Sequence, residues 1–394
     1  MAELRGRHLL MLQGPAGPFF ARVARQFQQA GACVTKVNFN GGEDLYFRGA
    51  SVVRYRGSLA HWPEFFEALV RERGVDGVVL FGDCRPLHRA AVVRAKALGL
   101  PVFVFEEGYL RPDFVTLERD GVNGHSPIPR DPDFFSQITP APEASRAPIS
   151  HAFLKSALHT VAYATAAAAL RPLYPHYRHH RDIRPLPQAA LWARGAMRRA
   201  VHTMRDRELG RRLETRELGP YFFVPLQVHL DSQLGHSGYA SIEDFIREVV
   251  QTFAEHAPPD HALVLKLHPM DRAYRDYGEL VSELTRRHAL RGRLHYVDVV
   301  NLPAALRGAV GTVVINSTVG LSSLTHGTPV KCLGTAVYDL PGLTHQGSLA
   351  TFFREPEPVD RALYKRFRHW LLQTNQLHGS VWSRLHEDPS RLVR

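Results

Sequence analysis

Cysteine and long apolar runs are both scarce in this sequence of 394 residues. The three cysteines, Cys33, Cys84 and Cys332, lie far apart, without a metal-ligand spacing or a disulfide framework, which favours a reducing compartment. No stretch approaches the roughly 20 apolar residues that cross a bilayer. The N-terminus lacks the apolar core of a signal peptide. We therefore expect a cytoplasmic protein without a membrane-spanning helix.

Acidic residues are outnumbered in this chain. There are 38 Asp and Glu against 49 Lys and Arg, which gives a formal net charge of +11. Such an excess points to an anionic partner: nucleic acid, acidic lipid or a phosphate-bearing substrate. A hydrophobic content of 44% and a charged content of 22% are ordinary for globular proteins and argue against wholesale disorder.

The glycine fingerprint of dinucleotide-binding proteins is also missing. The loop Gln13–Phe19 follows the first apolar run and has two glycines and two prolines, but it lacks the third glycine at the required spacing. Such a loop either brings backbone amides near a ligand or is only a tight turn before the next helix. The sequence favours neither interpretation.

What the sequence does contain is a regular alternation of apolar runs and amphipathic segments. The alternation predicts an α/β fold with two doubly wound, parallel, Rossmann-type sheets, and the length suits two domains because single cores stop growing near ~250–300 residues. The expected parts are an N-terminal domain (1–150), a basic helical segment (151–216), a C-terminal domain (217–350) and a terminal part (351–394). The helix of the terminal part is expected at 360–380 and packs back on the body. The expected strands are His8–Leu12, Cys33–Val37, Ser51–Tyr55, Gly77–Asp83, Pro101–Phe105, Tyr221–Gln227, Leu263–Lys266, Leu294–Asp298, Val313–Ile315 and Pro329–Leu333.

The segment Gly311–Leu324 organises the C-terminal half. A buried strand through Ile315 is followed by Asn316, Ser317 and Thr318, residue types that cap helix N-termini, and then by a short helix ending near Gly327. The N-terminus of such a helix suits a phosphate, although an ordinary capped helix fits the same pattern. A second buried strand ends in Lys266, His268 and Pro269, at the sheet edge where open α/β sheets bind ligands.

Polar side chains also gather at the strand ends of the N-terminal half. An acid pair followed by glycine and arginine is typical of a solvated loop or of a site, and both interpretations stay open. Residues 114–150 are expected to be rich in loops, and the pair Asp131 and Asp133 among them is interpreted as a turn rather than a metal site. The candidate residues at this edge are Gln13, Asn38, Asp83, Arg85, Glu106, Glu107 and Arg111.

The basic segment 151–216 has two interpretations. It is either a solvated helical hairpin between the domains or a surface that lies on anionic lipid headgroups, and we favour the second. Nucleic acid is not expected as a partner because no recognised nucleic-acid motif is present.

The polar groups of the C-terminal half suit a nucleotide monophosphate. Helix-terminal amides and hydroxyls would hold the phosphate, a cation would balance its charge, and a carboxylate, Asp231, would serve as nucleophile or base. No convincing acid pair is present, which fits a sugar donor with a single phosphate, such as a cytidine monophosphate (CMP) sugar, and no metal or cofactor. The candidate residues are Gln227, His229, Asp231, Lys266, His268, Pro269, Asn316, Ser317 and Thr318.

These segments resemble the KpsS-type capsular polysaccharide proteins of Gram-negative bacteria over nearly the whole chain. The resemblance is carried by Leu12-Gln-Gly-Pro-Ala-Gly-Pro-Phe-Phe20, Asn38-Phe-Asn-Gly-Gly42, Phe81-Gly-Asp-Cys-Arg-Pro86, Phe105-Glu-Glu-Gly-Tyr-Leu-Arg-Pro112, Val224-Pro-Leu-Gln-Val-His229, Leu267-His-Pro-Met-Asp271 and Ile315-Asn-Ser-Thr-Val-Gly-Leu321.

The resemblance implies a retaining β-Kdo transferase with a GT-B-like architecture, two domains facing a central cleft. Such an enzyme transfers Kdo from CMP-Kdo to lyso-phosphatidylglycerol at the cytoplasmic face of the inner membrane and starts the poly-Kdo linker of the capsule, with other capsule-assembly proteins as possible partners. It also implies that His268-Pro269 and Ser317-Thr318 bind CMP and that Asp231 is the nucleophile. The acid/base is Glu106 or Glu107, since relatives of the longer type have Glu-Asp there, and Arg111 meets an anionic group of acceptor or sugar.

Two alternatives remain open. Another CMP-sugar transferase, such as a sialyltransferase, would use the same donor groups. A non-catalytic membrane scaffold of capsule assembly would bind anionic vesicles without affinity for CMP-Kdo.

Overall fold

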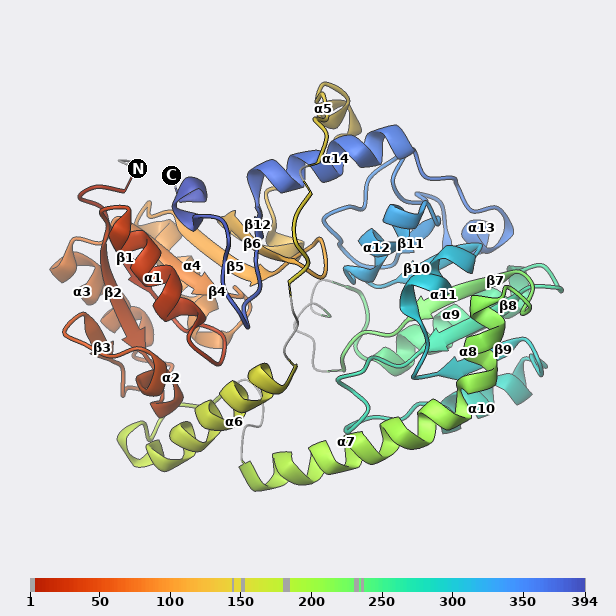
Figure 1. Ribbon diagram of the computed structural model, residues 1–394, viewed down its shortest axis with the longest axis horizontal. Helices are drawn as coiled ribbons and strands as arrows, with labels where there is room; N and C mark the ends of the chain where they lie inside the picture. The colour runs from red at the N-terminus through yellow and green to blue at the C-terminus, as the bar shows by residue number, and fades with distance from the viewer. Residues whose placement is uncertain are drawn as a thin grey trace. The chain divides into compact units, whose positions relative to one another are not determined.

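The computed structural model describes residues 4–143, 145–149, 153–179, 185–229, 234 and 237–393. The chain forms two compact units (Figure 1). Unit 1 comprises Met1–Pro127, Glu143–Gln188 and Leu371–Arg394, and unit 2 comprises Ile128–Pro142 and Ala189–Trp370. The basic segment 151–216 is therefore shared between the units, and the residues after 370 belong to unit 1.

Unit 1 is built on a seven-stranded sheet in the order β12-β6-β5-β4-β1-β2-β3. Neighbours from β3 to β5 pair in parallel, whereas β6 pairs antiparallel with both β5 and β12. Chain order reverses between β1 and β4, so the switch point of this sheet lies there. The strands are β1 (His8–Met11), β2 (Cys33–Asn38), β3 (Val52–Arg54), β4 (Gly77–Phe81), β5 (Val102–Glu107), β6 (Phe114–Arg119) and β12 (Gln376–His378).

Helices bury their apolar stripes against both faces of this sheet. Phe19, Phe20 and Phe27 of α1 join one core cluster, and Trp62 and Phe66 of α3 join the other. The helices are α1 (Phe19–Gln29), α2 (Gly41–Tyr46), α3 (Trp62–Arg73), α4 (Pro86–Ala97) and α6 (Phe153–Ala169).

Unit 2 repeats the same winding with five parallel strands in the order β11-β10-β7-β8-β9. Its switch point lies between β7 and β10. The strands are β7 (Tyr221–Pro225), β8 (Ala262–Lys266), β9 (Leu294–Val297), β10 (Gly311–Val314) and β11 (Val330–Cys332). The predicted α/β class and all ten predicted strands are confirmed.

The helices of unit 2 also cover two sheet faces. One core joins α9, α10 and α13, and the other joins α8, α11 and the opposite face of the strands. Phe135 of α5 lies 5.1 Å from Phe367 and 5.8 Å from Trp370, ring to ring, which explains why residues 128–142 belong to this unit. The helices are α5 (Pro132–Ser136), α7 (Pro185–Arg205), α8 (Arg207–Glu214), α9 (Ile242–His256), α10 (Gly278–Arg287), α11 (Leu302–Gly308), α12 (Val319–His326), α13 (Leu349–Arg354) and α14 (Arg361–Thr374).

The sequence predictions missed two strands. Residues 114–150 were expected to be rich in loops, but β6 occupies their beginning and pairs with β5. The terminal helix was expected to run to about residue 380, but α14 ends at Thr374 and β12 follows it. Both strands lie at the antiparallel edge of the unit 1 sheet, where long-range pairing rather than a local apolar pattern selects the strand.

The basic segment is helical, as predicted, and each of its parts packs on its own unit. In unit 1, a β-carbon added to Gly41 would lie only 2.4 Å from Leu170 Cβ, so α2 and the end of α6 pack closely. In unit 2, His202 of α7 lies 2.8 Å from Asp298, and Asp206 accepts from the backbone N–H of Asp298 at 2.7 Å. Among the helices of the described ranges, none has both the length and the apolar character that crossing a bilayer requires.

Candidate functional site

The switch point of unit 2 brings two of the predicted donor-site residues together. Gln227 follows β7 and Asn316 follows β10, and Gln227 Nε2 donates to Asn316 Oδ1 at 3.0 Å. Gln227 is buried, while Asn316 is only partly covered. Ligands of doubly wound sheets bind at this position, outside the carboxyl ends of the strands.

The start of α12 lies beside this pair. Asn316, Ser317 and Thr318 are all partly exposed, so packed side chains do not cover the turn. Thr318, at the N-cap position, makes no side-chain cap hydrogen bond. Ser317 Oγ instead accepts from Val319 N at 3.3 Å, and Ser317 O accepts from Gly320 N at 3.0 Å. The positive end of the helix is therefore accessible, although two of its first N–H groups already have acceptors.

Tyr338 fixes the position of this turn from within unit 2. Its hydroxyl donates to Ser317 O at 2.5 Å, and the side chain is buried. The phenol fits only because residue 320 is glycine: a β-carbon there would lie 2.0 Å from Tyr338 Oη. Neither Tyr338 nor the role of Gly320 was identified from the sequence, because nothing in the local pattern links them.

His229 and His268 are oriented by different partners. His229 Nδ1 lies 2.6 Å from Asp271 Oδ1, and Asp271 is fully buried and also accepts from His229 N at 2.9 Å. From the sequence, Asp271 was named only as part of a motif. The structure shows that Asp271 orients the ring of His229. His268 Nδ1 accepts from Met270 N at 3.2 Å, which places the proton of the neutral ring on Nε2. Pro269 is exposed.

Lys266 points into unit 2. The residue is only 8% exposed, and its ammonium donates to Leu267 O at 3.2 Å. Burial lowers the pKa of Lys266 to about 8, against the opposing effect of Asp298. Asp298 itself is held by Arg272 at 2.5 Å and by His202 of α7. Lys266 is therefore part of the charge network that anchors α7, rather than a side chain displayed at the surface to bind phosphate. Asp231, the predicted nucleophile, lies outside the described residues.

In unit 1, the structure separates the two candidate acids. Glu106 and Glu107 form the carboxyl end of β5 rather than a following loop. Burial raises the pKa of Glu106 to about 7, although the N–H of Glu107 donates to its Oε1 at 3.0 Å and lowers that pKa. Glu107 lies 2.9 Å from Arg111, and both side chains are about half exposed. The Glu106 carboxyl can therefore gain or lose a proton near neutral pH.

Gly82 lies against the Glu106 carboxyl, and its lack of a side chain leaves room for that group. This glycine has φ +68°, and a β-carbon on it would lie 3.2 Å from Glu106 Oε2. The left-handed conformation also disfavours any other residue here. The turn after β4 thus holds the backbone close to the end of β5.

The loop after Glu107 is held by residues from the C-terminal part of the chain. Gln376 Oε1 accepts from Tyr109 N at 3.0 Å and from Leu110 N at 3.3 Å, while its Nε2 donates to Thr116 Oγ1 at 3.0 Å. Gln376 is fully buried. The sequence prediction missed it because the clamp joins residues 267 positions apart.

Gln376→Ala is expected to destabilise unit 1. It leaves the buried N–H of Leu110 without an acceptor and leaves Tyr109 N with only Thr116 Oγ1, at 3.2 Å. An unsatisfied buried group of this kind costs about 1–3 kcal/mol. The measurement is urea unfolding followed by circular dichroism. Gln346→Ala removes a side chain of unit 2 whose amide donates to Thr344 O and Thr344 Oγ1, while its own backbone N–H still donates to Glu357, and it should change the midpoint little. Equal midpoints for the two variants would contradict the clamp.

The switch point of unit 1 gathers Gln13 and Arg85, as the sequence predicted, together with two phenols that it did not. Gln13 Nε2 donates to Tyr163 Oη at 3.1 Å and to Tyr177 Oη at 2.5 Å. Arg85 donates to Gly14 O at 3.1 Å. Burial lowers the pKa of Arg85, with the charge of Glu106 opposing that shift. Both tyrosines come from the basic segment, so this part of it completes the polar edge of unit 1.

Two other predicted residues are structural in this unit. Asn38 is fully buried, and its amide donates to Asp44 Oδ1 at 2.8 Å and to Phe47 O at 3.0 Å, which leaves it little capacity to meet a ligand. Asp83 is also buried, and it lies 3.0 Å from His125 Nδ1 and accepts from Val122 N at 3.3 Å.

Asp83, Cys84 and His125 form the one group of metal-ligand residue types found among the described residues. One ligand atom from each lies within 4.8 Å of the others. Burial and the Asp83 charge raise the pKa of the Cys84 thiol to about 12, so the apoprotein holds a protonated thiol there. The hydrogen bonds of the cluster satisfy Asp83 within the protein. The expectation that no metal is needed stays a prediction.

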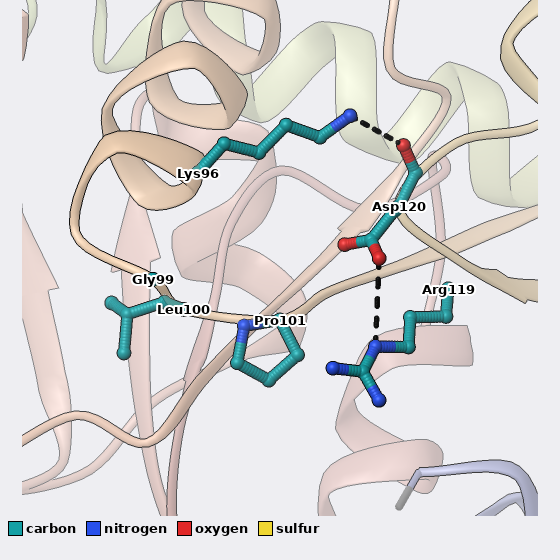
Figure 2. Close-up of a pocket in the computed structure, with 6 residues that line it drawn as sticks. All are labelled: Lys96, Gly99, Leu100, Pro101, Arg119 and Asp120. Carbon is teal, nitrogen blue, oxygen red and sulfur yellow. Dashed lines mark hydrogen bonds and ion pairs between the residues drawn. The ribbon is translucent and has the colours of Figure 1, made fainter.

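A cavity of about 360 Å³ in unit 1 lies away from these residues. Figure 2 shows Lys96, which donates to Asp120 O at 3.0 Å, and Arg119, whose Nε lies 3.5 Å from Asp120 Oδ2. The other lining residues, Gly99–Pro101, precede β5 at its amino end, whereas Glu106 is at its carboxyl end. This cavity is therefore separate from the candidate site.

Comparison with known proteins gives consistent matches. The chain is 39% identical over 377 residues to the capsule polysaccharide export protein KpsS of Escherichia coli, covering 95% of this chain and 97% of the relative. It is 38% identical over 386 residues to the capsule polysaccharide modification protein LipB of Neisseria meningitidis serogroup A, covering 96% and 92%. A solved structure, the beta Kdo 2,7 transferase KpsC of Thermosulfurimonas dismutans, aligns with a TM-score of 0.43 and 14% identity over 92% of this chain and 99% of that chain. A likeness of this degree carries no argument about activity.

The family model described as capsule polysaccharide biosynthesis protein matches residues 76–382. That range includes Glu106, the unit 2 switch point and Gln376. The resemblance drawn from the sequence motifs is confirmed. The chain belongs to the capsule polysaccharide biosynthesis protein family.

Proposed function

We propose that this protein is a retaining β-Kdo transferase that moves Kdo from CMP-Kdo to lyso-phosphatidylglycerol and so starts the poly-Kdo linker of capsular polysaccharide. The observation that carries the proposal is Glu106, a carboxyl with its pKa raised to about 7 at the carboxyl end of a doubly wound sheet. Perturbed acids at that edge are typical of active sites. Family membership supports the capsule context.

Unit 2 would bind the donor. The start of α12 and the Nε2–H of His268 would hold the CMP phosphate, and Gln227 and Asn316 would contact the nucleotide or sugar. Lys266 and His229 would act behind these groups, Lys266 through its positive charge and His229 through its bond to Asp271. No metal or other cofactor is part of the proposal.

The chemistry would proceed in two inverting steps that together retain configuration. A carboxylate oxygen of Asp231 attacks the anomeric carbon of Kdo, and the bond to the phosphate oxygen breaks, releasing CMP. An acceptor hydroxyl then attacks that carbon, the bond to Asp231 breaks, and the hydroxyl proton passes to the ionised Glu106 carboxylate. Arg111 and Arg85 would meet anionic groups of acceptor or sugar, and Gln13 would hydrogen-bond them.

We place the enzyme at the cytoplasmic face of the inner membrane, bound through its basic surface to anionic lipid. The net charge of +11 supports this placement. Exposed Met197, Val201 and Met204 of α7 lie among arginines, and they suit an interfacial helix. Nucleic acid is not a proposed partner, whereas other capsule-assembly proteins are.

The test is turnover with CMP-Kdo and a soluble lyso-phosphatidylglycerol analogue, followed by CMP release and by the anomeric configuration of the product. Asp231→Ala is expected to lose on the order of 10³-fold or more in transfer, because it removes the nucleophile of the proposed covalent step. CMP affinity, measured by calorimetry, should stay near that of the natural protein. Full transfer by this variant would refute the assigned role.

Two outcomes separate the alternatives. Turnover with CMP-sialic acid but not CMP-Kdo would make the protein a different CMP-sugar transferase. Binding to anionic vesicles without any affinity for CMP or CMP-Kdo would make it a scaffold.

A further inference from the structure

A second cavity of unit 1 has an unusual electrostatic character. It has a volume of about 310 Å³ and lies between α1 and the segment after β12. Its lining contains no carboxylate: the residues are Arg22, Arg25, Gln26, Gln29, Arg384 and Leu385. Three positive charges and two amides therefore surround a space large enough for a small organic anion.

The three guanidinium groups have no acidic partner among the described residues. None of them takes part in an ion pair or a side-chain hydrogen bond with that part of the chain. Two atoms of Arg22, Nε and Nη2, are buried without any acceptor. A buried donor without an acceptor is costly, and an anion that entered the cavity would relieve that cost after a rotation of the side chain.

The first half of α6 adds positive charge beside this cavity. Burial lowers the pKa of Arg22, and the neighbouring Arg25 lowers it further. Burial, followed by the charges of Arg22 and Lys155, also lowers the pKa of His159 on α6. These groups are thus close enough to repel one another. The same helix exposes Leu158 and Val161, with 61% and 42% of their surface accessible.

The presence of three guanidinium groups favours a phosphate over a carboxylate as the bound anion. A carboxylate has two oxygens, which a single arginine fork satisfies. A phosphate group has more acceptor oxygens and can be held by several forks at once, which is why arginine clusters recognise phosphate. The amides of Gln26 and Gln29 would supply further donors to ester or hydroxyl oxygens.

We propose that Arg22, Arg25 and Arg384 form a binding site for a phosphate group, carried either by an anionic phospholipid headgroup or by a soluble phosphate ester. The site is distinct from the carboxyl edge of the unit 1 sheet, since it lies along α1 and the C-terminal segment. It does not depend on the proposed transferase reaction. In a membrane-bound protein it would hold one headgroup beside the exposed aliphatic residues of α6.

The experiment uses the full chain and the double variant Arg25→Gln/Arg384→Gln, which leaves the half-buried Arg22 in place so that folding is preserved. One arm measures binding to phosphatidylcholine vesicles with and without phosphatidylglycerol, and the other measures glycerol phosphate by calorimetry. Removing two charges should weaken binding roughly 30-fold, because each basic residue near an anionic surface contributes about a 5-fold gain. Loss in the vesicle arm alone assigns the lipid, and loss in the ester arm assigns a soluble ligand.

A charge-matched control is available on the other side of the same unit. Arg71→Gln/Arg94→Gln removes two exposed arginines that pair with Glu67. Equal weakening of binding by both double variants would overturn the proposal, since the loss would then depend only on the net charge of the protein. Unchanged binding of both probes by Arg25→Gln/Arg384→Gln, or no binding by the natural protein, would overturn it too. Transferase turnover with a soluble acceptor should be the same in all three proteins, so failure of this site and failure of the proposed reaction are distinguishable.

Discussion

Glu106→Gln is expected to lower transferase turnover by about 10²–10⁴-fold, the usual contribution of a positioned acid or base. The amide keeps the size of the side chain and can still accept from Glu107 N, but it cannot take the proton of the acceptor hydroxyl. CMP binding should be unchanged, because the residue belongs to unit 1 and the proposed donor groups belong to unit 2. The measurement is single-turnover transfer from CMP-Kdo, which separates chemistry from product release.

Glu107→Gln is the matched control, one residue away with the same change of charge. Its carboxylate is half exposed and pairs with Arg111, and exposed ion pairs contribute little. Turnover should fall less than about 10-fold, within the range of a modest loss of binding. A larger loss in Glu107→Gln than in Glu106→Gln would reverse the assignment of the acid/base.

The pH dependence gives an independent reading of the same residue. The pKa of Glu106 is raised from 4.5 to about 7, so the carboxyl is largely protonated at pH 6 and ionised at pH 8. A base must be ionised, and turnover should therefore rise as the pH increases through about 7. The Gln variant has no such group and should lose this limb of the profile. If the variant kept the same rise of turnover near pH 7, that rise would belong to another residue.

Gly320→Ala is expected to cause the second large effect. A β-carbon there would lie 2.0 Å from Tyr338 Oη and 2.5 Å from Cζ, far inside van der Waals contact. The ring of Tyr338 is buried and cannot move freely, so either the tyrosine or the first turn of α12 must shift. Overpacking of this kind costs about 1–3 kcal/mol, and CMP affinity should fall by roughly 10-fold or more because the turn is displaced.

Tyr338→Phe separates displacement from the loss of a hydrogen bond. It removes the bond to Ser317 O without adding any atom, and a typical bond of this kind is worth about 1 kcal/mol. Its CMP affinity should therefore lie between those of the natural protein and Gly320→Ala. If Gly320→Ala bound CMP as tightly as the natural protein, the start of α12 would have no part in donor binding.

The sequence predicted the parallel strands well because each is a short buried run with a strong local pattern. Leu263–Lys266 and Val313–Ile315, for example, are recognisable from β-branched residues and flanking turns. The antiparallel strands β6 and β12 were missed, since their pairing depends on contacts across the chain rather than on composition. Because the parallel strands were predicted well, the polar residues that follow them were placed at the carboxyl edges of the two sheets.

Side-chain roles were harder to predict than positions. Gln227 and Asn316 were both predicted, and the structure brings them together because their strands are neighbours in the sheet. Asn38 was predicted at the same kind of position, but its partner Asp44 belongs to α2, a helix that the sequence pattern did not reveal. Tyr163 and Tyr177 were missed because their segment was interpreted as a solvated helical hairpin or as a lipid-facing surface, and not as part of a polar sheet edge. Contacts between distant segments decide which polar groups remain accessible.

The clamp made by Gln376 has a consequence for biosynthesis. The loop beside Glu106 obtains its acceptor from a residue synthesised 267 positions after Tyr109. While the ribosome is translating the intervening segments, Leu110 N can bond only water or temporary partners, and Tyr109 N has only Thr116 Oγ1. The acid-bearing end of unit 1 must therefore mature late, after translation has passed β12, although most of its sheet is synthesised first. A nascent chain stalled before residue 376 would have β5 and β6 but neither β12 nor the final geometry of the loop between them.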